Sequence, residues 1–331
     1  MARERVGGAN RRRFGLASVR EAALLPVLVL LLVVGAFVNG RFLSSANLID
    51  ILGASSALAL VVLAESLILI SGKFDLSLES TVGLAPAVGV LLVASQADRG
   101  WGVHVPVWLG FLCILLTGAI VGAINGTLVV KLRLNAFIVT LAMLIVLRGL
   151  LVGVTKGNTL FSVPDAYLYL GAQTAAGVPV SVWLAIAIFI AAGVLLGHHR
   201  LGRAIYAIGG NRQAARAAGI NVDAISFGVF VAGGVLASLA GLILAGRLGA
   251  VSANQGNGMI FTVFAAAVIG GVSLEGGKGT VLGAATGVLL LGVVDNLLTL
   301  AQVQTFWIQA IYGVIILLAL ALARVTSGRE E

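Results

Sequence analysis

The sequence predicts an all-α, polytopic membrane protein. Of its 331 residues, 60% are hydrophobic and only 10% are charged, and the mean hydropathy is +1.10. Soluble globular proteins are about 45–50% apolar and about 25% charged. Many apolar runs approach or exceed the roughly 18 residues that a membrane-spanning helix requires, which favours helices over strands. We therefore expect about ten transmembrane helices embedded in a lipid bilayer.

The apolar runs give the order of these helices. A short basic tail, residues 1–21, precedes them, and residues 325–331 form a C-terminal tail, so the membrane domain covers 22–324. The first run is too long for the core of a signal peptide, and no small-residue cleavage site follows it. The expected spans are residues 22–38, 48–70, 78–94, 105–130, 136–154, 182–197, 225–245, 260–272, 281–301 and 306–323.

The basic residues indicate the orientation. Threading the ten spans in order places 16 of the 21 lysines and arginines on one side of the membrane. Because cytoplasmic loops carry the excess of positive charge, we expect both termini and the segment 198–223 in the cytoplasm. The net charge of +8 is therefore a sign of topology and not of nucleic-acid binding.

Two places depart from plain spanning helices. Residues 260–272 are too few to cross a bilayer, and residues 71–77 place charge and glycine between two spans. Non-helical backbone at membrane depth is tolerated only when it is buried in protein or lines a cavity. We expect both places to be broken helices.

A short internal echo accompanies the breaks. The motif Gly-Ala-x-x-Gly at 118–122 recurs at 283–287, each time followed by an asparagine. The two copies lie in the fourth and ninth spans, an offset that reverses orientation, as in the inverted repeats of transporters. Glycines four residues apart, which also occur at 149–153 and 193–197, equally mark close helix contacts without any repeat. Both interpretations stay open.

A basic segment interrupts the apolar chain at 198–223. Asn211 is a suitable N-cap, residues 212–218 are strong helix formers, and Gly219 can adopt the left-handed conformation that ends a helix. Seven residues are too few for a stable isolated helix, so this one must lie against a surface. A soluble docking partner and the lipid headgroups both offer such a surface.

Acidic residues inside spans are costly and are therefore functional candidates. Glu65 and Asp295 lie within expected spans, where a structural role explains them best. That role would tie the carboxylate to a helix N-terminus or pair it with Lys73, Lys131 or Arg148. Beside the 71–77 break, polar residues cluster and favour function. The substrate-pathway candidates are Asp75, Ser77, Glu79, Asn125, Asn135 and Phe137, although interhelical hydrogen bonding explains the asparagines equally well.

Patterns of catalysis are missing from the sequence. Residues 271–280 contain glycines and a lysine, but Val272 and Gly279 break the spacing of a phosphate-binding loop. There is no His-Glu-x-x-His and no cluster of cysteine and histidine that could hold a metal. We expect no catalytic residue, no metal site and no cofactor in this chain, so a partner must supply any ATP site.

The basic segment carries a family resemblance. The stretch LGRAIYAIGGN at 201–211, followed by AGINV at 218–222, resembles the cytoplasmic loop of bacterial ABC sugar-importer permeases of the ribose, xylose, arabinose and galactose type. Residues 75–77, 125–141 and 265–283 are similar to further motifs of that family. The likeness covers about residues 22–324.

The resemblance implies the permease subunit of an importer for a ribose-like pentose or a hexose, in the bacterial cytoplasmic (inner) membrane. It implies a homodimer or heterodimer of permeases, a cytoplasmic ATPase that binds ATP and Mg²⁺, and an extracytoplasmic sugar-binding protein. The ATPase would dock on the loop. The residues implied in coupling are Gly202, Arg203, Tyr206, Gly209, Gly210, Asn211, Arg212, Ala214, Ala215, Arg216, Gly219 and Ile220.

The chain departs from the family pattern Gly-Gly-Ile-Asp-Leu-Ser-Val-Gly at one place. It has Lys73 and Phe74 before the aspartate, and Leu78 and Glu79 after the serine. The two added charges could serve a different ligand or pair with each other. An alternative from another class is an ion-coupled secondary transporter, with Glu65, Glu79 or Asp295 as the ion site. Strict dependence on ATP and partner proteins would separate the two.

Overall fold

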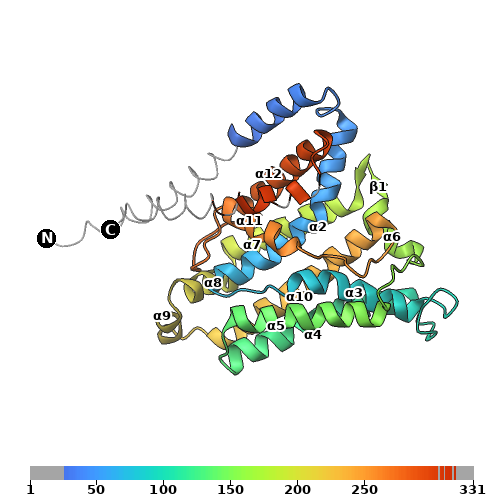
Figure 1. Ribbon diagram of the computed structural model, residues 1–331. Helices are drawn as coiled ribbons and strands as arrows, with labels where there is room; N and C mark the ends of the chain where they lie inside the picture. Colours follow the sequence, from blue (N-terminus) through green and yellow to red (C-terminus); the bar gives the residue numbers. More distant parts are fainter. Residues whose placement is uncertain (1–25, 305, 309, 315–316, 318–331) are drawn as a thin grey trace.

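A computed structural model describes residues 26–304, 306–308, 310–314 and 317 (Figure 1). The expected tails at 1–21 and 325–331 lie outside the described residues, as do parts of the first and last expected spans. The principal elements in chain order are α1 (Pro26–Val38), α2 (Ser45–Ile70), α3 (Leu78–Val93), α4 (Val107–Gly126), the π-helical turn η1 (Thr127–Lys131), α5 (Ala136–Thr155), α6 (Asp165–Ala172), β1 (Thr174–Ala175), β2 (Val178–Pro179), α7 (Val180–His198), α8 (Arg200–Gly210), α9 (Arg212–Ala217), α10 (Val222–Leu248), α11 (Met259–Ile269) and α12 (Val281–Leu300).

The described chain is mostly helical, with strands only in the short β1–β2 hairpin, as expected for an all-α polytopic membrane protein. Six helices of the described part are long and apolar enough to cross a membrane: α2, α4 with η1, α5, α7, α10 and α12. Helices α1, α3 and α11 are apolar but shorter. The short α11 fits the expectation of a broken helix at 260–272, and the 71–77 segment is indeed not helical up to Ser77.

Helix α10 is the centre of the bundle. It packs most extensively against α4, and next against α2 and α3. Glycine makes the α4 contact possible, because a Cβ at Gly118 would lie 2.2 Å from the carbonyl oxygen of Gly234. A Cβ at Gly287 on α12 would likewise lie 2.0 Å from the carbonyl oxygen of Ala266 on α11. The Gly-x-x-x-Gly spacing thus predicts both contacts correctly.

The other two glycine pairs are different. At 149–153 on α5 and 193–197 on α7, an added Cβ would meet no described atom within 4 Å. The prediction of close helix contacts at these two pairs is therefore wrong within the described chain. The Gly-x-x-x-Gly spacing identifies a helix face without side chains, but it does not determine whether another helix packs against that face.

The short basic helix forms as expected. Helix α9 begins after Asn211, whose side-chain oxygen accepts a hydrogen bond from the Ala214 N–H at 2.9 Å. Gly219 follows it in the left-handed conformation with φ of 79°. The preceding α8 is an additional helix that sequence reasoning did not predict. Its apolar spacing at Ile205 and Ile208 is helical, but its three glycines obscured the pattern.

The bundle has two distinct ends. Helices α8 and α9 lie at one end, and α6 and the β1–β2 hairpin lie at the other (Figure 1). The antiparallel hairpin pairs Thr174 with Pro179 and Ala175 with Val178. Neither α6 nor the hairpin was predicted, because both are too short to give a periodic hydrophobic signal.

Candidate functional site

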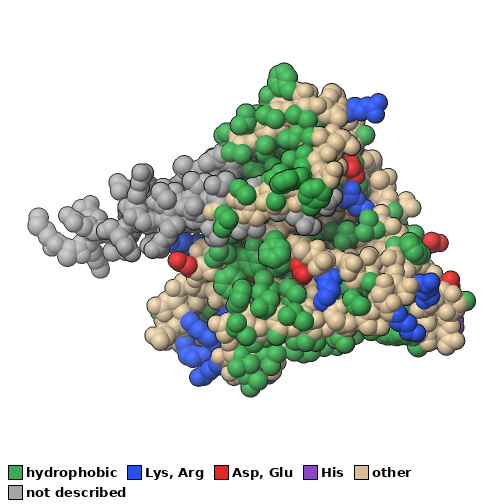
Figure 2. Space-filling view, in the orientation of Figure 1, with side chains coloured by type: hydrophobic (Ala, Val, Ile, Leu, Met, Phe, Trp, Pro, Cys, Tyr) green, Lys and Arg blue, Asp and Glu red, His purple; other side chains and the backbone are tan. Residues whose placement is uncertain are grey.

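The charges of α9 are bound within the chain. Arg212 and Arg216 both donate hydrogen bonds to Oδ1 of Asp223, at 2.8 and 3.0 Å. Because Asp223 lies in the first turn of α10, these two ion pairs hold α9 against α10. Figure 2 shows basic side chains gathered at this end of the molecule, where Arg133, Arg212 and Arg216 line a surface hollow. The two arginines therefore position α9 in addition to giving it a positive surface.

Helix α9 presents one face inward and one outward. Ala215 is buried and packs with Ile208 and Val222, whereas Ala214 is exposed. Because Ala215 is buried, it cannot contact a docking partner, and it instead packs α9 against α8 and α10. The predicted coupling residues that stay exposed are Arg203, Gly210, Asn211, Ala214, Arg216 and Gly219.

Helix α8 lies against the start of the 71–77 break and against the loop between α11 and α12. The Gly277 N–H donates to the Ile70 carbonyl oxygen at 2.9 Å, which joins the end of α2 to the loop before α12. Gly209 lies over this joint, and a Cβ there would come 1.8 Å from the Ile70 oxygen and 2.5 Å from the Gly277 nitrogen. The Tyr206 hydroxyl donates to the Gly279 carbonyl oxygen at 2.7 Å. We call this contact of α8, residue 70 and residues 277–279 the glycine junction.

The 71–77 break begins beside the glycine junction. Lys73 is half-buried there, and burial together with the nearby Arg212 guanidinium lowers the pKa of its ammonium group. Phe74 packs near Phe264 of α11, with ring centroids 6.0 Å apart. Lys73 and Phe74 depart from the family pattern. Lys73 thus lies near Arg212 of α9, and Phe74 lies near α11.

Three of the predicted pathway residues come together in one buried group. Oδ1 of Asp75 accepts hydrogen bonds from the Ser77 N–H at 2.9 Å and the Ser77 hydroxyl at 2.6 Å. The Asn125 side-chain amide donates to the Asp75 carboxylate and, at 2.8 Å, to the Ser77 hydroxyl. The Asp75 N–H in turn donates to Glu65 at 3.3 Å. These four residues, which we call the Asp75 network, connect α2, the break and α4 without a basic side chain.

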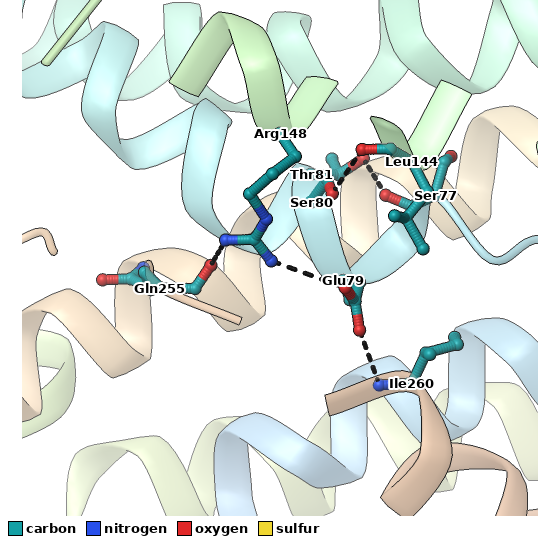
Figure 3. Close-up of polar contacts among 8 residues, drawn as sticks. All are labelled: Ser77, Glu79, Ser80, Thr81, Leu144, Arg148, Gln255 and Ile260. Carbon is teal, nitrogen blue, oxygen red and sulfur yellow. Dashed lines mark hydrogen bonds and ion pairs between the residues drawn. The ribbon is translucent and has the colours of Figure 1, made fainter. Parts of the chain in front are cut away.

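Glu79 has a separate set of partners (Figure 3). Its Oε1 lies 3.4 Å from the Arg148 guanidinium of α5, and its Oε2 accepts from the Ile260 N–H at 3.1 Å. Arg148 also donates to the Gln255 carbonyl oxygen at 3.2 Å. Glu79 therefore joins α3, α5 and the first turn of α11, where a carboxylate suits the helix dipole. Of the basic partners considered from the sequence, Arg148 is the one found, and Lys73 does not pair with Glu79.

The remaining two pathway candidates lie elsewhere. Asn135 caps α5, since its side-chain oxygen accepts from the Ile138 N–H at 3.2 Å. The side chain of Phe137 is 49% exposed on the outside of the same helix. The structure therefore groups Asp75, Ser77 and Asn125, places Glu79 in an ion pair, and leaves Asn135 and Phe137 at the start of α5.

Sequence reasoning did not single out Gln255, a further part of the Glu79 region. Its side-chain amide donates to the carbonyl oxygens of Val82 and Gly241, at 2.9 and 3.0 Å, and fixes the chain before α11 to α3 and α10. The glycines around it, Gly256 and Gly258, both have positive φ angles. A polar residue beside two glycines at the start of a short apolar run is the signal that could have identified it.

Comparison with known proteins covers almost the whole chain. Residues 47–320 match the family described as "Branched-chain amino acid transport system / permease component". The chain is 37% identical to the ribose import permease protein RbsC of Escherichia coli strain K12, over 94% of this chain and 96% of that protein. It is 36% identical to the autoinducer 2 import system permease protein LsrC of Klebsiella pneumoniae, over 92% and 86%. No solved structure matches the chain.

Proposed function

The chain belongs to the family of permease components of branched-chain amino acid transport systems, and on that premise we propose that it carries a monosaccharide into the cytoplasm. Its similarity to a ribose import permease, over nine tenths of both chains, supports a ribose-like pentose or a hexose as the substrate. It is a transport subunit and not an enzyme. ATP and Mg²⁺ would be bound by a partner ATPase, and a binding protein outside the membrane would deliver the sugar.

We propose ten membrane helices, some of them broken, in a bacterial cytoplasmic membrane. The six long helices form the frame, and the shorter α1, α3, α11 and the helix from residue 306 complete the set. The end with α8 and α9 would face the cytoplasm together with both termini. The clustering of Arg133, Arg212 and Arg216 at that end supports this orientation, because positive charge is retained on the cytoplasmic side.

The proposal that ATPase movement is coupled to the membrane helices rests on the glycine junction. An ATPase docked on the exposed face of α8 and α9 would push directly on the end of α2 and on the loop before α12. Because these segments adjoin both breaks, a small movement of α8 would reach α3 and α11 together. A second permease subunit, identical or related, would place two such junctions over a pair of ATPases.

Replacing Gly209 tests the coupling proposal. In Gly209→Ala the new methyl group would overlap backbone atoms of residues 70 and 277, which cannot rotate away, at a cost of about 1–3 kcal/mol. We expect the variant to lose transport and sugar-stimulated ATP hydrolysis in the complex with its ATPase and binding protein. Gly228→Ala on α10 is the matched control, because its Cβ would meet no described atom within 4 Å and Gly228 is not among the predicted coupling residues.

Two results would contradict the proposal. Equal transport by Gly209→Ala and Gly228→Ala would show that the glycine junction has no part in coupling. Sugar uptake driven by an ion gradient in vesicles without any ATPase would instead favour the secondary-transporter alternative. Size-exclusion profiles of both variants establish that loss of transport is not loss of folding.

A further inference from the structure

A cavity of about 440 Å³ lies between α2, α10, α11, α12 and the helical residues after 306. It is located toward the end opposite the glycine junction, since Asp50 is near the start of α2 and Arg247 is near the end of α10. In the proposed orientation this is the extracytoplasmic half. None of the pathway residues predicted from the sequence lines this cavity.

Polar groups from α2, α10 and α12 line the cavity. At the rim, Arg247 donates to Asp50 at 2.9 Å, and both side chains are partly exposed. Asp295, which is also exposed, accepts a hydrogen bond from the Tyr312 hydroxyl at 2.8 Å. Ser55 lines the cavity, but its hydroxyl is buried against Gly292 of α12 and has no hydrogen-bond partner among the described residues, so it must rotate about χ1 to reach a ligand. A buried hydroxyl without a partner is costly, so an incoming ligand or water that bonds to it gains free energy.

The charge and shape of the lining restrict the ligand. Among the described residues its charged members are Asp50, Asp295 and Arg247, and the arginine is already paired, so a ligand carboxylate would find no free cation in this part of the lining. Apolar side chains, including Leu58 and Met259, form the rest of the wall. Interleaved hydrogen-bonding and apolar groups suit a neutral molecule that has hydroxyls on a hydrocarbon ring.

We propose that this cavity is a sugar-binding station on the transport path, at which Ser55 and Asp295 hydrogen-bond to sugar hydroxyls. This inference rests on the proposed function and adds the site to it. The Asp50–Arg247 pair at the rim favours neutral polyols over amino acids, because it leaves no unpaired positive charge for a carboxylate. The station binds with modest affinity, as release toward the cytoplasm requires.

Cysteine protection tests the station in the full chain. Cys113 is the sole cysteine, so Cys113→Ser gives a background for Thr262→Cys inside the cavity. The matched control is Ala218→Cys, at the exposed C-cap of α9. The variants are labelled with a maleimide in lipid nanodiscs. We expect one of D-ribose, D-xylose, L-arabinose and D-galactose to slow labelling at 262 but not at 218. L-leucine should have no effect at either position.

A transport measurement complements the labelling. In the complex with ATPase and binding protein, Ser55→Ala and Asp295→Ala should each raise the KM for the protecting sugar about tenfold, as expected for one lost hydrogen bond, with a smaller change in the maximal rate. Leu282→Ala, an exposed residue at the other end of α12, should leave both parameters unchanged. A variant that merely folds poorly would lower the maximal rate and keep KM.

The outcomes separate the two proposals. If the complex transports one of the four sugars but that sugar protects neither position and the KM values are unchanged, the station is wrong and the proposed function stands. If none of the sugars is transported while L-leucine is, the proposed function itself fails. Protection at 262 by L-leucine alone would overturn the assignment of the cavity to sugars.

Discussion

Two buried carboxylates at the start of α3 are held in opposite ways. Asp75 is surrounded by neutral donors from Ser77 and Asn125, whereas Glu79, one helical turn later, faces the Arg148 guanidinium and the N–H of Ile260. Both were equally good candidates for the substrate pathway. The difference shows that a buried acid in a membrane helix can be stabilised by hydrogen bonds or by a counter-charge, and the two solutions predict different responses to substitution.

The largest effect is expected at Glu79. Glu79→Ala leaves the Arg148 guanidinium, 18% exposed, without its counter-charge and removes the acceptor of the Ile260 N–H. Removing one member of a buried ion pair costs about 3–5 kcal/mol. Thermal unfolding of the purified protein in detergent measures the loss of stability.

The double variant Glu79→Leu with Arg148→Met checks the cause. Because an apolar pair carries no unpaired charge, we expect it to recover most of the stability. A double variant as unstable as Glu79→Ala would show that the Ile260 hydrogen bond matters more than the charge.

Amide substitutions sharpen the contrast at intermediate size. Asp75→Asn keeps one oxygen for the Ser77 donors and creates no unpaired charge, so we expect a loss of about 1 kcal/mol. Glu79→Gln keeps its shape but leaves Arg148 unpaired, so we expect about 2–3 kcal/mol. Unfolding midpoints of the two variants, compared side by side, test the order. The reverse order would mean that the Asp75 network, and not the ion pair, depends on full negative charge.

The smallest effects are expected at Asn135 and Phe137, the two pathway candidates that lie outside the Asp75 network and the Glu79 ion pair. Asn135→Ala removes the cap of α5 and should cost about 1 kcal/mol of stability. Phe137→Ala changes an exposed side chain and should cost less than about 0.5 kcal/mol. Sugar uptake should remain normal in Phe137→Ala. Reduced uptake at unchanged stability would return Phe137 to the pathway.

Much of the architecture could be predicted from the sequence because it depends on local or one-dimensional patterns. The ends predicted from the apolar runs for α2, α5, α7, α10 and α12 lie within a few residues of the observed ends. The cap at Asn211 and the left-handed Gly219 gave the bounds of α9. These signals depend on residues that are close neighbours in the chain, so no tertiary information is required to interpret them.

The partners of the polar residues could not be predicted in the same way. Glu79 and Ile260 are 181 residues apart, and Asp75 and Asn125 are 50 apart, so only helix packing determines which donor reaches which carboxylate. The same packing decides that the glycines on α4 meet α10 while those on α5 remain uncovered.

By itself the sequence determined that this is a polytopic helical permease with two breaks and a basic loop, because hydropathy, charge and caps act over short distances. Only the tertiary structure decided that α8 contacts both the 71–77 break and the loop before α12, that Asp223 pairs with both arginines of α9, and that Ser55 and Asp295 line the same cavity. The physical reason is that each of these contacts joins helices through close packing, and spacing along the chain does not specify which faces meet.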